Sequence, residues 1–95
     1  MKLRCRTDII ANILSSINSR GSAGASKSHI VEIADISYMK LKHYEPLLTR
    51  CGLTDLEDDT NLYFVTPKGQ KYLELYQSIS ELEEVIPLKA MLTIK

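Results

Sequence analysis

One stretch of the chain decides the fold: residues 36–52, ISYMKLKHYEPLLTRCG. Leu41, Tyr44 and Leu48 recur there at steps of three and four residues, which is the spacing of one face of an α-helix. Ser37 is a favourable helix cap, and Gly52 is a typical residue just beyond a helix end. The sequence therefore predicts a helix from Ser37 to about Cys51 whose apolar side faces a core.

The opposite side of this predicted helix is polar and mostly cationic. At about 100° per residue it carries Met39, Lys42, His43, Pro46 and Arg50, with Ser37 and Lys40 at its amino-terminal edge. A proline inside a helix removes one hydrogen bond, so a bend is expected at Pro46. We expect this side to be exposed.

The residues before this helix predict two more helices. Residues 7–18 place five apolar side chains at helical spacing, and glycine and other small residues at 21–25 predict a loop. Ser26 can cap a second helix over residues 27–34, which we expect to end near Asp35. Ile30, Ile33 and Ala34 share one face of this helix and are predicted to be buried.

The residues after Gly52 change to a strand pattern. Apolar and β-branched residues flank the polar run at 57–61, which predicts a hairpin over residues 53–65. Thr66 and Pro67 then suit the start of a last helix, because a hydroxyl can cap it and proline fits its first turn. The pair Ile86-Pro87 predicts its end, since the residue before proline avoids helical geometry.

Two motifs in this order resemble a known family. Residues 36–44 with Leu48 and residues 52–53, and then Tyr-Phe-Val-Thr-Pro-Lys-Gly at 63–69, resemble the recognition helix and wing of small archaeal winged helix-turn-helix regulators. The resemblance covers about residues 7–86. It implies a DNA-binding regulator or chromatin-associated protein, often dimeric through an antiparallel coiled coil of the last helix.

The predicted fold class is mainly α with a small β-hairpin (α+β), a winged helix-turn-helix with a long carboxy-terminal dimerisation helix. We expect residues 1–66 to form the winged domain, residues 67–86 the dimerisation helix and residues 87–95 a tail. The predicted partners are double-stranded DNA and a second copy of the chain. A helix of this kind fits a major groove, where its first turns meet base edges and its flanks meet phosphates.

Nine residues are predicted to contact DNA. Lys40 and Lys42 suit guanine acceptors or phosphates, Met39 suits a thymine methyl group, and His43 suits either kind of contact. The other candidates are phosphate contacts at two helix starts, where amide hydrogens are exposed: Lys27, Ser28, His29, Ser37 and Tyr38. The basic segment Lys2, Arg4 and Arg6 is a further candidate. The alternative is that Lys40, Lys42, His43 and Arg50 form only the solvated face of an amphipathic helix.

A heptad stripe marks the last helix. It consists of Tyr72, Leu75, Ile79, Leu82 and Ile86, spaced by three and four residues. The stripe predicts pairing with a twin helix, in either orientation, while Leu73 and Tyr76 beside it are free to pack on the domain. The alternative is that the stripe itself packs on its own domain.

Charge is distributed unevenly along the chain. Residues 1–50 carry eight Lys or Arg against four acids, whereas residues 51–95 carry four against eight. The hairpin tip at 55–61 has four acids and no cation, so phosphates would repel it. This leaves a second interpretation open, a winged-helix module that binds a protein through its acidic hairpin. The hairpin lacks the glycine and terminal glutamate of a calcium-binding EF-hand loop.

Other function classes find no support in the sequence. No apolar run is long enough to span a membrane and the start is too polar for a signal sequence, so a cytoplasmic protein is expected. Cys5 and Cys51 predict two buried reduced thiols rather than a disulfide or zinc site. With His29 and His43 as its histidines and no phosphate-binding loop, the chain is not expected to be an enzyme. No cofactor, metal or small-molecule substrate is predicted.

Overall fold

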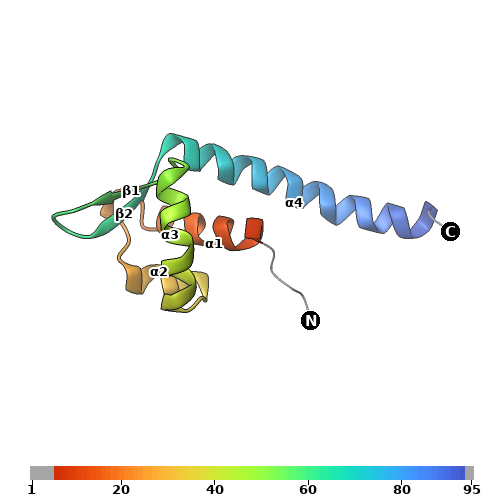
Figure 1. Ribbon diagram of the computed structural model, residues 1–95. Coiled ribbons are helices and arrows are strands. Elements are labelled where there is room, and N and C mark those ends of the chain that lie inside the picture. The colour runs from red at the N-terminus through yellow and green to blue at the C-terminus, as the bar shows by residue number, and fades with distance from the viewer. Residues whose placement is uncertain (1–5, 94–95) are drawn as a thin grey trace.

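The computed structural model describes the backbone of residues 6–93, with the side chains of residues 6–79, 81 and 82. The predicted order of elements is confirmed (Figure 1): α1 (Arg6–Asn18), the short 3-10 turn η1 (Gly21–Ala23), α2 (Lys27–Ala34), α3 (Tyr38–Arg50), β1 (Thr54–Glu57), β2 (Leu62–Val65) and α4 (Pro67–Thr93).

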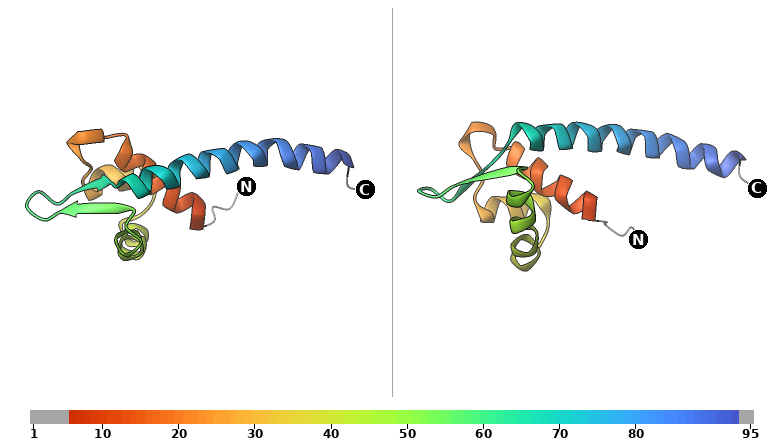
Figure 2. Two further views of the ribbon diagram at one scale, coloured as in Figure 1. Left: turned by 90° about the horizontal axis from the view of Figure 1, so that it is seen from above. Right: turned by 45° about the horizontal axis from the view of Figure 1, so that its top comes forward.

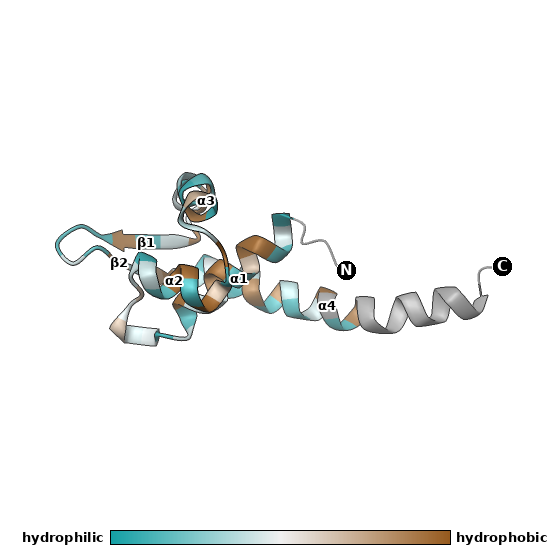
Figure 3. Cartoon of the chain, turned by 90° about the horizontal axis from the view of Figure 1, so that it is seen from below, coloured by the Kyte–Doolittle hydropathy of each residue, from teal (hydrophilic) through white to brown (hydrophobic). Residues whose placement is uncertain are grey.

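Helix α1 forms the centre of the core. It buries five aliphatic side chains at helical spacing, and Ile13, Leu14 and Ile17 are at most 1% exposed. The predicted apolar face of α3 packs against them through Leu41 and Leu48, while hydrophilic residues concentrate at the hairpin tip (Figure 3). Burial of these apolar side chains contributes most of the favourable free energy that holds α3 in place.

Helix α2 confirms its predicted bounds but not its whole predicted apolar face. Ser26 caps it and accepts a hydrogen bond from the amide of His29, and Ile30 is fully buried. Ile33 is 51% exposed, so the expectation that it is buried was wrong. The physical reason is that a helix of eight residues contacts the core along a narrow line, which Ile30 and Ala34 occupy.

The turn between α2 and α3 is short. It begins at Asp35, which has left-handed backbone geometry with a φ of 58°. The amide of Ile36 returns to the carbonyl of Val31, and the Ile36 side chain packs against the core. This turn fixes the direction in which α3 leaves α2.

The hairpin is completed by a residue far away in the sequence. Strands β1 and β2 pair antiparallel, with Leu56 opposite Tyr63. Ala25 adds an antiparallel bridge to Tyr63 on the other edge of β2, with N···O distances of 3.0 and 2.8 Å. The residue before it, Gly24, has a φ of 78°, and a Cβ there would lie 2.8 Å from the Phe64 ring. The bridge connects the hairpin to the segment that begins α2.

Helix α4 starts in close contact with the hairpin. Thr66 caps it as predicted, accepting from the amide of Gly69 at 3.0 Å and donating to the carbonyl of Gly52 at 2.5 Å. A Cβ on Gly69 would lie 2.3 Å from the carbonyl oxygen of Leu53, so glycine is required at this position. The first turn of α4 is thereby fixed by backbone contact.

The predicted end of α4 at Ile86-Pro87 was wrong, because the helix continues past Pro87 to Thr93. The fixed φ of proline is compatible with a helix, and the loss of one hydrogen bond is a cost that a helix can absorb by bending. The separate tail predicted from residue 87 is therefore helical as far as Thr93. Over its 27 residues α4 is about 40 Å long and projects beyond the other elements (Figures 1 and 2).

Three further expectations concern a thiol, a membrane span and a metal site. Cys51 is an exposed free thiol at the end of α3, so its predicted burial was wrong, and Cys5 lies outside the described residues. Cys51 lies one position past the last helical turn, where the chain already faces solvent. Among residues 6–93, no helix combines the length and apolarity of a membrane span, and no described cluster of three or more His, Cys, Asp or Glu residues is placed to hold a metal ion.

Candidate nucleic-acid interface

Helix α3 presents the predicted contact residues on its outer side. Ser37 caps the helix by accepting from the amide of Lys40 at 3.0 Å, which orients the first turn. Met39 is 79% exposed, and Tyr38 is 57% exposed. The remaining predicted residues of the helix are exposed as well: Lys40, Lys42, His43, Pro46 and Arg50. A partner can reach this face, because Leu41, Tyr44 and Leu48 hold the opposite side of the helix against the core.

The positive charge of this face is not neutralised within the described part of the chain. The ion pair found there joins Lys71 and Glu74 on α4, at 4.0 Å. No described carboxylate lies within ion-pair distance of Lys40 or Lys42. Cations that are exposed and unpaired are available to an anionic partner at little desolvation cost.

The starts of α2 and α3 are joined side by side. The hydroxyls of Ser28 and Tyr38 lie 2.9 Å apart and share a hydrogen bond, which brings two of the predicted phosphate contacts together. His29 is more constrained than predicted, because its Nδ1 accepts from the backbone amide of Ser26 at 3.2 Å. In the neutral ring its Nε2–H is then the donor left for a partner.

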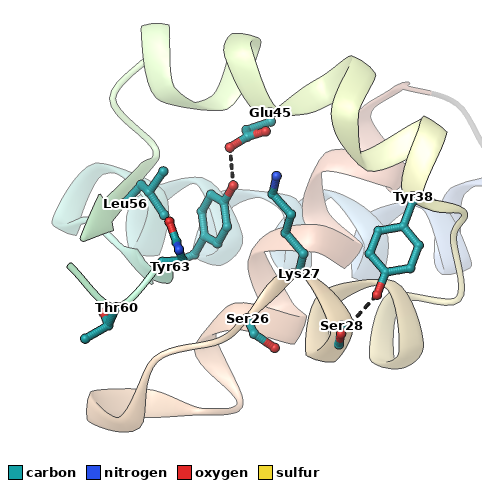
Figure 4. A pocket seen from close by; sticks show the side chains of 9 residues that line it. Ser26, Lys27, Ser28, Tyr38, Glu45, Leu56, Thr60 and Tyr63 are labelled. Atoms are coloured by element: carbon teal, nitrogen blue, oxygen red, sulfur yellow. Dashed lines mark hydrogen bonds between the residues drawn. The ribbon is translucent and has the colours of Figure 1, made fainter. Parts of the chain in front are cut away.

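A cleft of about 410 Å³ separates the start of α2, the flank of α3 and the hairpin (Figure 4). Lys27 extends into it from α2, and Glu45 points into it from α3, where it accepts a hydrogen bond from the hydroxyl of Tyr63. Burial, and then the bond to Glu45 and its charge, raise the pKa of Tyr63 above its usual range. The phenol is therefore a neutral donor at physiological pH.

Sequence reasoning missed Glu45 as a member of this site. The available signal was its spacing of seven residues from Tyr38 and three from Lys42, which places all three on one flank of the helix. Its partner Tyr63 lies 18 residues away on another element, and nothing in the sequence indicated that contact.

The hairpin tip has the opposite charge. Its four acids, Asp55, Glu57, Asp58 and Asp59, are exposed, and Thr60 donates to Glu57 at 2.7 Å. A surface of this charge is repelled by phosphates. The cationic face of α3 and the acidic tip therefore suit different partners.

Most of the heptad stripe of α4 is exposed. Leu75, Ile79 and Leu82 are 54%, 53% and 58% exposed. Tyr72 is partly buried against the core of its own domain together with Leu73, and Tyr76 donates to Asp8 of α1 at 2.5 Å. The side chain of Ile86 lies outside the described residues.

A winged helix-turn-helix family model matches residues 3–84. The chain belongs to this family. The geometry agrees with the assignment, since α2 and α3 form the helix-turn-helix and β1 and β2 form the wing.

The winged helix-turn-helix chain is similar to a solved structure along nearly its whole length. The crystal structure of Sso10a-2, a DNA-binding protein from Sulfolobus solfataricus, matches 97% of this chain and 98% of its own with a TM-score of 0.71. The two sequences are 20% identical, so the likeness concerns the fold. None of the curated protein sequences matches the chain significantly.

Proposed function

We propose that this protein binds duplex DNA as a homodimer, with α3 in the major groove, and acts as a transcriptional regulator or an architectural DNA-binding protein. The observation that carries the proposal is the exposed and unpaired cationic face of α3, held outward by a buried apolar face. The winged helix-turn-helix family and the likeness to a protein described as DNA-binding support it.

The proposed contacts divide into two sets. Met39, Lys40, Lys42 and His43 face the base edges or the adjacent phosphates, because they lie on the first turns of α3. Lys27, Ser28 and His29 at the start of α2, with Ser37 and Tyr38, contact phosphates. The bond between Ser28 and Tyr38 supports this second set by keeping both hydroxyls at one place.

The proposed dimer contact is the stripe Tyr72, Leu75, Ile79, Leu82 and Ile86. Three large apolar side chains in a row, each more than half exposed, are costly to leave in water. A two-fold dimer would read two half-sites, which raises both affinity and specificity.

Titration of labelled duplex DNA with the full chain at several salt concentrations tests the proposal. DNA binding through phosphates requires an affinity that falls steeply as salt rises, because counterions are released on binding. Binding that is absent or independent of salt would refute it.

The acidic hairpin supports a second candidate, a module that binds a basic protein surface. Its four acids are exposed beside Leu56, which is 38% exposed on the same strand. The same titration separates the two functions, since a module whose contact surface is acidic is not expected to bind DNA.

A further inference from the structure

Glu45 stands beside the proposed DNA-reading face. With Tyr38 and Lys42 it lines a second cavity of about 230 Å³ along the flank of α3, next to the exposed face. A carboxylate at that place needs an explanation, because it repels the phosphates that the neighbouring lysines attract.

The position of this carboxylate is fixed by the wing. Tyr63 is 3% exposed, and its hydroxyl donates to Oε2 of Glu45. Among the described hydrogen bonds, none uses Oε1. The Glu45 side chain is thus held at one oxygen, with the second oxygen available beside the cleft of Figure 4.

The chemistry of a carboxylate fixed in this way determines which groups on DNA it can bind. An ionised carboxylate is an acceptor without a donor, so it gains nothing from a phosphate or from the acceptor edge of guanine. In the major groove the donors are the amino groups of cytosine and adenine, and a carboxylate pairs with cytosine N4. Glu45 therefore disfavours backbone contact in general and favours DNA that offers an amino group at one position.

We propose that Glu45 is a specificity-determining residue, which selects a base pair presenting cytosine N4 to the flank of α3, and that Tyr63 is its positioning residue. This inference rests on the proposed DNA-binding function. It assigns to the hydrogen bond between helix and wing a role in sequence choice, beyond the attachment of the wing.

The test is selection of bound sequences from a random duplex library by the full chain, followed by affinity measurements on random and selected duplexes. Glu45→Gln keeps an acceptor for Tyr63 and removes the charge. Wild-type protein is expected to select a fixed C·G pair in each half-site. Glu45→Gln should lose roughly tenfold discrimination there and bind random duplex roughly fivefold more tightly.

Two further variants separate the role of Glu45 from its surroundings. Tyr63→Phe leaves the charge but frees the carboxylate, so the C·G preference should weaken while repulsion of random duplex remains. Glu74→Gln removes a carboxylate on α4, outside the cleft, and should match wild type. If Tyr63→Phe does not fold, Glu45→Gln still decides the result.

Failure of this inference is distinguishable from failure of the proposed function. If Glu45→Gln selects the same sequences with the same affinities as Glu74→Gln, Glu45 serves only to stabilise Tyr63. If wild-type protein binds DNA with steep salt dependence but selects no C·G pair, the inference also fails while DNA binding stands. If wild-type protein binds no DNA, both fail.

Discussion

Helices α3 and α4 each pack one side against the same core, α3 through buried and α4 through partly buried side chains, and both expose a row of side chains elsewhere. The row on α3 is cationic and polar, with Lys40, Lys42 and His43 exposed. The row on α4 is aliphatic, with Leu75, Ile79 and Leu82 each more than half exposed. Exposed cations remain hydrated at little cost and attract anions from a distance, whereas exposed aliphatic groups gain free energy only when another apolar surface covers them.

The comparison teaches that one small domain can present two exposed rows of opposite chemistry. If the proposed function holds, damage to one row should leave the other partner bound. Two of the three variants below test this separation, and the third tests how α4 is attached.

The largest effect is expected on the row of α4. Leu75→Asp together with Ile79→Asp places two charges where the dimer contact is proposed, and should weaken dimerisation by about 4 kcal/mol, roughly a thousandfold. Sedimentation should then show half the wild-type mass, with the helical circular dichroism signal retained. Gln77→Asp adds a charge elsewhere on α4 and should leave the mass unchanged; an unchanged mass in the double variant would place the interface elsewhere.

The second effect concerns how α4 is attached. Gly69→Ala introduces a Cβ within 2.3 Å of the Leu53 carbonyl oxygen and 2.6 Å of Val65 Cγ1. The start of α4 must move, and the free energy of unfolding should fall by about 3 kcal/mol. Urea denaturation measures this. Lys68→Ala, at the exposed neighbouring position, should change it by less than about 0.5 kcal/mol, and equal values for both variants would contradict the close contact.

The smallest effect is expected on the row of α3. Lys42→Glu reverses one exposed charge and should weaken DNA binding by about 1–3 kcal/mol, with a shallower salt dependence. Sedimentation of this variant should still give the wild-type mass. Lys71→Glu makes the same charge change on α4 and is the control. An affinity of Lys42→Glu equal to that of the control would move the DNA contact away from α3.

The contrast also shows where sequence reasoning succeeds. The bounds of α2 and α3 were predictable, because Ser26, Ser37 and Gly52 are local signals and the periodicity of α3 is regular. The position of the cationic face followed from the same periodicity. Such features depend on neighbours within a few residues along the chain.

The errors arose where a local preference competes with its surroundings. The exposure of Ile33 depends on which side of a short helix contacts the core. The continuation of α4 past Pro87 depends on whether the helix tolerates the loss of one backbone hydrogen bond. The bridge from Ala25 to Tyr63 and the bond from Tyr63 to Glu45 join separate elements. No periodicity or cap encodes such contacts, so the cleft beside α3 could not be predicted.

The close contact at Gly69 gives α4 a fixed starting point, from which distances along the helix can be counted. Because its first turn abuts the backbone at Leu53, the helix axis leaves the wing in one fixed direction relative to α3. If the proposed dimer is antiparallel, moving the crossing point by seven residues on both helices would change the separation of the two α3 helices by about 20 Å, about 10 Å from each α4. The choice of half-site spacing on the operator would then be encoded in the register of α4, far from any nucleotide.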